Sequence, residues 1–213
     1  MIKPKDLKVN LEDKSLQVSA RMKLDSWEDC LDSARVTIWK DGLGKEPSDT
    51  FKRKMVISEH SPLREVVFVV DINGIQSWVS VHLVRHFLGV EKYVSTQRAD
   101  RVESPIKRSE MTQGQLVNMR IVVNAQALIN ISRVRLCHCA SIETFQAWNS
   151  VIRAVGEIDK IIAQACVPNC VYRGFCSEGS NAKNRCNYAN HTIQKMRVTY
   201  LERFCEKGCF ING

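Results

Sequence analysis

The sequence contains no long run of apolar residues, no low-complexity tract and no internal repeat. A helix that crosses a bilayer needs about 20 consecutive apolar residues, and no window of this chain reaches that length. The first residues, Met1 to Lys8, also lack the apolar core of a signal peptide. We therefore expect a cytoplasmic protein that has no membrane partner.

Aromatic residues are scarce, at 7% of the chain, so few aromatic side chains are available for nucleic-acid bases to stack on. The hydrophobic content of 44% and the charged content of 25% are typical of a globular protein. The net charge of +8 attracts polyanions, which include nucleic acids but also nucleotide phosphates, flavin pyrophosphate and folate glutamates. We expect no specific nucleic-acid partner, and a zinc-containing nucleic-acid binder stays open as an alternative.

The spacing of apolar residues predicts an α+β fold. We expect a mixed, mostly antiparallel sheet flanked by helices, with a small cysteine-rich C-terminal appendage. Strands are expected at 65–72, which Asn73-Gly74 should end, at 90–96 and 115–123, and as a hairpin over 6–24. Helices are expected at 51–57, 75–86 and 124–136, from a cap at Ser26, and as one long segment over 141–162.

The chain has 9 cysteines, an odd number that favours reduced thiols or a metal site over disulfides. Most of them lie near the C-terminus, so we divide the chain into a domain over 1–165 and a cysteine-rich tail over 166–213. Zinc bound by four thiolates often holds such a small segment. The predicted ligands of this structural zinc are Cys166, Cys170, Cys176 and Cys186, with Cys205, Cys209, His138 and His191 as spare candidates. Thiols without metal are the alternative, and Cys137 and Cys139 are expected to pack rather than react.

Cations and hydroxyls gather at His82-Leu83-Val84-Arg85-His86 and again at Ser95-Thr96-Gln97-Arg98. Such groups bind phosphate and the polar edge of a pyrimidine, because a guanidinium donates two parallel hydrogen bonds. The alternative is an Arg-His pair that closes a helix, since the C-terminus of a helix attracts cations.

Four segments in one order, within about residues 30 to 150, favour the first interpretation. They are Ser33-Ala34-Arg35-Val36-Thr37, Ser58 to Arg64 with its His60-Ser61-Pro62 turn, Leu83 to Arg98, and Asn124 to Leu136. Together they resemble the flavin-dependent thymidylate synthase family. The resemblance implies an FAD-dependent methyltransferase that converts dUMP to dTMP, with NADPH as reductant and methylenetetrahydrofolate as one-carbon donor. It also implies a homotetramer whose active sites are built from several subunits.

The resemblance further assigns roles to single residues. Arg135 and Arg85 would be catalytic, with Arg135 stabilising negative charge that develops on the pyrimidine ring. The substrate-binding residues would be His82, Arg85, Ser95, Thr96, Arg98 and Arg135. The cofactor-binding residues would be Thr37, Ser61, Arg85, His86, Asn124, Gln126 and Asn130. From the residues alone, Ser61 also fits the start of a turn, and Asn124 also fits a helix cap.

Three residues depart from the family pattern. Phe87 stands where the last residue of an Arg-His-Arg signature is usual, Gln126 replaces an arginine, and Arg64 replaces an acid. The stretch between Arg98 and Asn124 is also short, and a further substrate arginine usually lies there in the family. These departures leave two alternatives open: a flavin-dependent hydroxymethylase of pyrimidine nucleotides, and a non-catalytic nucleotide-binding protein on the same scaffold.

Overall fold

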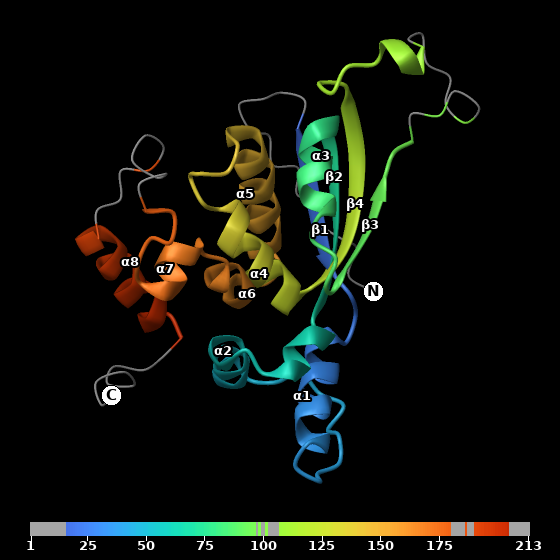
Figure 1. Cartoon of the computed structure of the whole chain (residues 1–213). Helices are drawn as coiled ribbons and strands as arrows, with labels where there is room; N and C mark the ends of the chain where they lie inside the picture. The colour runs from blue at the N-terminus through green and yellow to red at the C-terminus, as the bar shows by residue number, and fades with distance from the viewer. Residues whose placement is uncertain are drawn as a thin grey trace.

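Figure 1 shows the computed structural model of the chain, which describes residues 16–96, 98, 101, 107–179, 186 and 190–204. The strands are β1 (Gln17–Met22), β2 (Val67–Gln76), β3 (Val90–Val94) and β4 (Leu116–Asn124). The helices are α1 (Ser26–Val36), α2 (Asp49–Ser58), α3 (Ser77–Val84), α4 (Ala125–Arg135), α5 (Ile142–Gly156), α6 (Lys160–Ala165), α7 (Asn169–Arg173) and α8 (Asn190–Glu202). Two short 3-10 helices are η1 (Ser61–Glu65) and η2 (Arg108–Glu110). The predicted α+β fold is confirmed.

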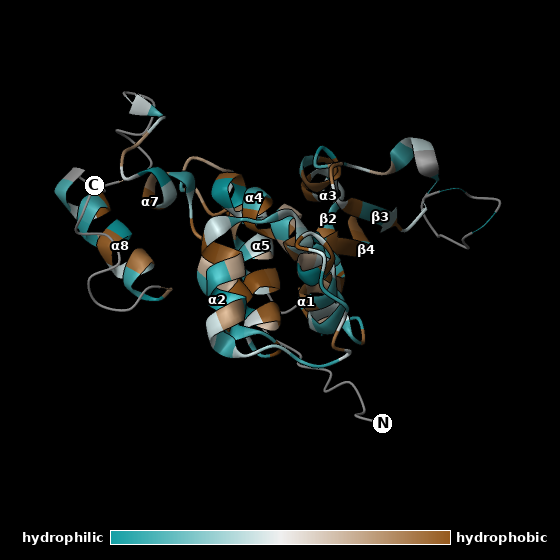
Figure 2. Cartoon of the chain, turned by 90° about the horizontal axis from the view of Figure 1, so that it is seen from below, coloured by the Kyte–Doolittle hydropathy of each residue, from teal (hydrophilic) through white to brown (hydrophobic). Residues whose placement is uncertain are grey.

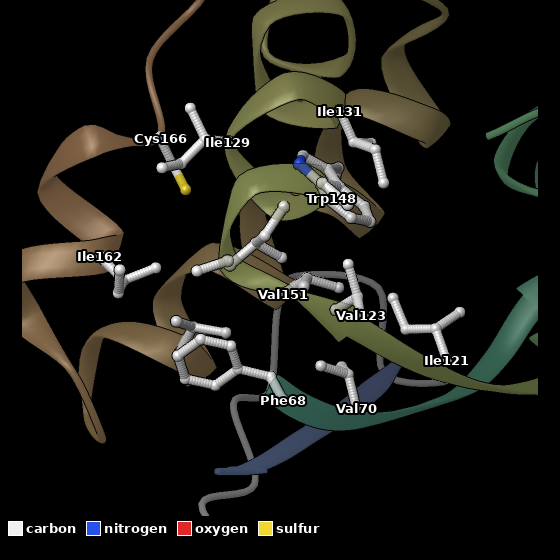
Figure 3. Packing of buried hydrophobic residues seen from close by; sticks show 14 of the residues in the cluster. Phe68, Val70, Ile121, Val123, Ile129, Ile131, Trp148, Val151, Ile162 and Cys166 are labelled. Carbon is white, nitrogen blue, oxygen red and sulfur yellow. The ribbon is translucent and has the colours of Figure 1, made fainter. Parts of the chain in front are cut away.

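The four strands pair antiparallel in the order β1-β2-β4-β3, and helices cover one face of this sheet. Along β4, buried side chains alternate with more exposed ones, so the strand has one dry face and one wet face. Figure 3 shows the dry face packed against α4 and α5: among the labelled side chains, Phe68, Val70, Ile121 and Val123 come from the sheet, and Ile131, Trp148 and Val151 come from the helices that cover it.

The buried indole of Trp148 sits between the sheet and α4 without an unpaired polar atom. Its Nε1 donates to Ser132 Oγ at 2.9 Å, and this hydroxyl in turn donates to the carbonyl of Leu128 at 2.8 Å. Trp148 is only 1% exposed, so an unpaired N–H here would carry its full desolvation penalty. The hydroxyl of Ser132 therefore allows a large aromatic side chain to fill the centre of the core.

Strand β2 does not end at Asn73-Gly74, which corrects the prediction made from that dipeptide. The strand continues to Gln76, and its pairing with β4 shifts between Ile72 and Ile75. Gly74 has a φ of 76°, in the region that favours glycine, and its N–H donates to Asn118 Oδ1 at 3.1 Å. The dipeptide thus makes a bulge inside the strand, and α3 begins at Ser77 rather than near Ile75.

The long helix expected over 141–162 is two helices, α5 and α6, and the prediction of one helix was wrong. Asp159 separates them: its backbone is extended, and its carboxylate accepts a hydrogen bond from the N–H of Ile162 at 2.9 Å, as an N-cap does. The same carboxylate accepts from the indole N–H of Trp27 at 2.6 Å. The apolar spacing continued through the break, which is why periodicity alone did not reveal it.

Helix α1 begins at Ser26, the residue predicted to be its cap, so the observed cap lies one residue earlier than predicted. Ser26 lies inside the first turn and its hydroxyl donates to the carbonyl of Lys23 at 3.0 Å, while Asp25 is the N-cap residue in a left-handed conformation. Strand β1 pairs with β2, and the first strand of the hairpin expected over 6–24 lies outside the described residues. The other predicted strands and the helix at 51–57 are confirmed within a few residues.

The tail contains two helices, α7 and α8, that its composition did not predict. In Figure 2 both lie beyond α4 and α5, on the side away from the sheet. Val171 on α7, Tyr200 on α8 and Phe204 just after α8 join the same buried cluster as the sheet. The division at residue 166 stays a prediction. Among the described residues, no helix is both long and apolar enough to cross a membrane.

Replacing Asp159 with alanine tests the junction between α5 and α6. The change removes an N-cap, worth about 1 kcal/mol, and leaves the buried Trp27 N–H unpaired, which costs about 1–3 kcal/mol. We expect D159A to lower the free energy of unfolding in urea by about 2–4 kcal/mol. The control D41A removes an exposed carboxylate and should change it by less than about 0.5 kcal/mol. Equal effects of the two variants would contradict this account.

Candidate functional site

The C-terminal ends of α3 and α4 meet through Arg135. Its Nε donates to His86 Nε2 at 2.9 Å, and its Nη2 donates to the carbonyl of His82 at 2.7 Å. The His82 ring is fixed on its other side, where Nδ1 lies 3.0 Å from the hydroxyl of Thr144 at the start of α5. His82 on α3 and His86 just after it, both singled out by the sequence analysis, are therefore in direct contact with the predicted catalytic arginine on α4.

Arg135 donates to His86 Nε2, so this nitrogen accepts and carries no proton in the arrangement observed. Burial, followed by the nearby charges of Arg135 and Lys92, lowers the pKa of His86 to about 4. Burial and then Arg85 also lower the pKa of Arg135. The guanidinium keeps its charge, because arginine is not deprotonated in proteins. A neutral histidine thus orients a charged arginine without neutralising it.

Three more charged side chains, Lys92, Arg85 and Glu143, act on His82, His86 or Arg135. Lys92 on β3 donates to the carbonyls of His86 at 2.7 Å and Val84 at 3.2 Å, which ties β3 to the end of α3. Burial, Arg135 and Arg85 all lower the pKa of His82, while the carboxylate of Glu143 acts in the opposite direction. The net effect is a lowered pKa, so the positive charges outweigh Glu143 at this position. We call His82, Arg85, His86, Lys92 and Arg135 the cation cluster.

Ser95, Thr96 and Arg98 lie beyond the far end of β3 from His86. The Ser95 hydroxyl accepts from the N–H of Asn118 at 3.0 Å, and the Thr96 hydroxyl accepts from the N–H of Arg98 at 3.2 Å. Ser95 lines a shallow groove on the wet face of the sheet, together with Asp71, Asn73, Tyr93, Val94, Asn118, Met119 and Arg120. The substrate role of these three residues stays a prediction, as does that of Arg85, which is exposed at the end of α3.

Asn124, Gln126 and Asn130, at the β4–α4 junction and on α4, already have hydrogen-bond partners within the chain. Asn124 caps the helix, because its Oδ1 accepts from the N–H of Ala127 at 2.8 Å. Gln126 Nε2 donates to Glu59 at 2.7 Å and to Asn130 at 3.3 Å. A flavin that contacted these side chains would have to share or replace these bonds.

Glu59 and Arg133 form an ion pair that the sequence analysis did not single out. Arg133 donates to Glu59 and to Asn130 Oδ1, and its guanidinium lies 3.6 Å above the ring of Tyr172. Burial alone would raise the pKa of Glu59, but hydrogen bonds from Arg133 and Gln126 outweigh it and lower that pKa. Because the Arg133–Glu59 contact spans 74 positions of the sequence, no local pattern could have revealed it.

The other predicted cofactor residues are at element ends. The hydroxyl of Thr37 donates to the carbonyl of Ala34 at 2.7 Å and helps to close α1, and Ser61 is the first residue of η1. Both are exposed, as are Arg64 and Phe87, two of the positions that depart from the family pattern. Phe87 is 73% exposed next to the cation cluster, so no part of the core requires an aromatic residue there.

Cys166, one of the four predicted zinc ligands, is part of the hydrophobic core beside Ile129 and Ile162 (Figure 3). The other three line a cavity of about 100 Å³ with Cys137 and Cys139. Burial, followed by the neighbouring Cys137, raises the pKa of the Cys139 thiol to about 11. In the described part of the chain, no three His, Cys, Asp or Glu side chains are positioned to hold a metal ion together.

The lowered pKa of His86 makes stability depend on pH. The unfolded chain binds a proton at His86 near pH 6.5, but the folded chain does so only near pH 4. This contribution to stability is therefore complete above pH 6.5 and is lost as the pH falls toward 4. Solvent around the half-exposed ring reduces its size to about 1 kcal/mol.

We expect the free energy of unfolding of the wild type to fall more than that of H86Q between pH 7 and pH 4.5. Urea titrations at the two pH values measure this difference, and subtraction of the variant removes the contributions of the carboxylates. Parallel curves for the two proteins would show that His86 is not held neutral by the fold.

Among solved structures, the chain is similar to the flavin-dependent thymidylate synthase ThyX from Helicobacter pylori in complex with FAD and dUMP. The TM-score is 0.57 and the sequence identity 14%, over 70% of this chain and 99% of that chain. No family model and no curated protein matches the sequence. At this identity the likeness shows a shared fold, and the fold is the one that the four segments implied.

Proposed function

We propose that the chain is a flavin-dependent thymidylate synthase, which reductively methylates dUMP to dTMP. The observation that carries the proposal is the contact of Arg135 with His82 and His86. His86 and Arg135 come from two of the four segments that resemble the family, His82 directly precedes one of these segments, and the three residues meet at one place. The fold shared with a structure that binds FAD and dUMP supports the same activity.

The cation cluster has the charge that an anionic nucleotide requires. Arg120 forms an ion pair with Asp71 and Arg133 forms one with Glu59, whereas Arg135 contacts an imidazole and a carbonyl. Its positive charge is therefore available to a ligand, and a phosphate or an electron-rich pyrimidine oxygen would gain from it. Arg85 adds a second exposed guanidinium beside it.

The residues of this chain would position the reactants. Arg135 and Arg85 would hold dUMP. The neutral His86 would fix the orientation of the Arg135 guanidinium through its hydrogen bond. Thr37, Ser61 and the polar end of α4 would hold FAD, which supplies hydride transfer when it is bound and reduced by NADPH. Methylenetetrahydrofolate would bring the carbon that is added. A protein nucleophile is not part of this proposal, so Ser95 and Thr96 would act by binding the nucleotide.

A second copy of the chain would complete the site. Apolar side chains are exposed around the cation cluster: Val81, Val84, Phe87, Leu88 and Val134 are all at least 38% exposed. Exposed apolar patches of this kind mark interaction surfaces. We therefore propose a homo-oligomer, as in the family, in which this patch contacts another subunit.

The non-catalytic alternative rests on Phe87 and Gln126. The side chain of Gln126 is hydrogen-bonded to Glu59 and carries no charge that could bind a flavin phosphate. Phe87 is exposed and carries no charge either. A nucleotide-binding protein on this scaffold would bind dUMP without FAD. A hydroxymethylase would bind both, and only the identity of the product distinguishes it from the methylating enzyme.

The first experiment is the visible absorption spectrum of the purified chain with and without added FAD. We expect a bound-flavin spectrum that NADPH bleaches and that dUMP perturbs, followed by formation of dTMP when methylenetetrahydrofolate is added. Binding of dUMP without any flavin binding would replace this proposal with the non-catalytic alternative. Formation of hydroxymethyl-dUMP would replace it with the hydroxymethylase.

Replacement of Arg135 with glutamine tests the centre of the cluster. The change removes a charged hydrogen-bond donor, an interaction worth about 1.5–3 kcal/mol, so we expect dUMP affinity to fall about tenfold or more. Isothermal titration with dUMP measures this loss. The control R153Q removes an exposed arginine from α5, outside the cluster, and should leave the affinity unchanged. An equal loss in both variants would indicate only an effect of net charge.

Phe87 offers a gain-of-function test. F87R restores the charge usual at this position of the family, at a side chain that is 73% exposed and so tolerates the change. A new hydrogen bond to a flavin phosphate is worth about 1 kcal/mol, so FAD affinity should rise about fivefold. The matched control is L88R, one residue away and 77% exposed. If L88R raised the affinity as much as F87R, the gain would be nonspecific.

A further inference from the structure

Five cysteines surround one cavity, and they come from both parts of the chain. Cys137 and Cys139 follow the end of α4, Cys170 lies on α7, and Cys176 and Cys186 belong to the tail beyond it. The cavity of about 100 Å³ is large enough for an ion with its bound sulfur atoms but is also lined by apolar side chains such as Leu136 and Ile193. Thiols gathered in a small, poorly packed appendage are the usual setting of a structural metal.

We propose that this cavity binds one structural zinc ion through the thiolates of Cys137, Cys170, Cys176 and Cys186. Four thiolates around one ion form the closed tetrahedral site that structural zinc prefers. Relative to the ligands predicted from sequence spacing, Cys137 takes the place of Cys166. The fifth thiol, that of Cys139, lies beside Cys137 and is not a ligand in this proposal.

The replacement of Cys166 follows from its surroundings. Cys166 is 7% exposed, belongs to the buried core with Ile129 and Ile162, and is not one of the residues that line the cavity. Cys137 lines the cavity with the three tail cysteines, although it is far from them along the chain. Sequence spacing favoured Cys166 because it is near the other three along the chain, whereas the fold brings Cys137 to them.

The thiols line the cavity without yet being placed to hold an ion together. Zinc would therefore draw the tail closer to the end of α4, and the free energy of binding would become free energy of folding for the tail. The N–H of Gly174 donates to the carbonyl of Cys170 at 2.8 Å and closes α7, and the N–H of Ala140 donates to the carbonyl of Cys137 at 2.9 Å in the turn after α4.

Such an ion would fasten α7 and α8 to the helix that carries Arg135. Cys137 is the second residue after Arg135, whose guanidinium binds the end of α3. Zinc would thus fix the C-terminal end of α4 from one side while α3 contacts it from the other. This role does not depend on flavin or nucleotide chemistry, so it stands or falls separately from the proposed function.

The test is the metal content of the full-length chain, purified under reducing conditions without chelator and measured by mass spectrometry of the elements. We expect about one zinc per chain in the wild type and a loss of most of it in C137S and in C170S. The matched control is C166A, which removes a thiol outside the cavity and should keep the zinc. Circular dichroism of each variant shows whether the sheet and helices have formed.

Each other outcome overturns the proposal in a different way. Zinc that is kept in C137S and lost in C166A would restore the ligand set based on sequence spacing. A brown protein that contains iron and sulfide would replace zinc with an iron–sulfur cluster. A wild type without metal, whose cavity thiols form disulfides or react fully with a thiol reagent, would leave a cluster of cysteines with no metal role.

If C137S failed to fold, cobalt substitution of the wild type would still decide the question. Tetrahedral thiolate ligation gives cobalt intense sulfur-to-metal absorption, and the intensity scales with the number of thiolates. We expect a spectrum of four thiolates in both the wild type and C166A. A weak spectrum typical of oxygen ligands in the wild type would contradict the site.

Discussion

The rest of the structure depends on burying one face of a four-stranded sheet. The dry side chains of β2 and β4 require a cover, and α4 and α5 provide it through Ile131, Trp148 and Val151. Helix α4 has a second contact surface, because α7 and the Glu59–Arg133 pair lie against its other side. Helix α4 therefore lies between the sheet and the tail. It ends at Arg135, and Cys137 follows two residues later. The positions of the cation cluster and of the cysteine cavity follow from the packing of this one helix.

Much of the fold could be predicted because the physical signal was local. The alternation along β4 and the apolar run of β2 each depend on neighbouring residues that face the core; β4 is where the pattern placed it, and β2 contains most of its predicted residues but extends beyond its predicted end. The breaks were harder to predict. An Asn-Gly pair is compatible with a bulge inside a strand as well as with the end of a strand, so the sequence did not distinguish the two at Gly74. The cap at Asp159 ends one helix and begins the next without a change in the apolar spacing. In both cases the deciding interaction is with a residue far along the chain, Asn118 or Trp27.

The residues of the candidate site also separate into those that a local pattern predicted and those that only the fold revealed. His82, His86 and Arg135 were found because they belong to short segments with a recognisable order, and the structure brings them into contact. Lys92, Glu59 and Arg133 were missed, since a lysine in a strand and two distant charges carry no motif. The predicted set of zinc ligands included Cys166 for a related reason. A sequence shows only how far apart residues are along the chain, and Cys166 is near the other three cysteines by that measure. Residues that act through long-range contacts need the fold before they can be named.

The junction of β4 and α4 has a further consequence. Asn124 is both the last residue of the strand and the cap of the helix, so no loop separates the two elements. The helix therefore cannot turn independently of the sheet, and Arg135 has a fixed direction with respect to it. A ligand that needed the guanidinium at a different angle would have to bend the sheet, which is much stiffer than a loop. The chain would thus select ligands by rigid shape, and substitutions deep in its core, such as at Val123 or Trp148, would change selectivity without touching the ligand.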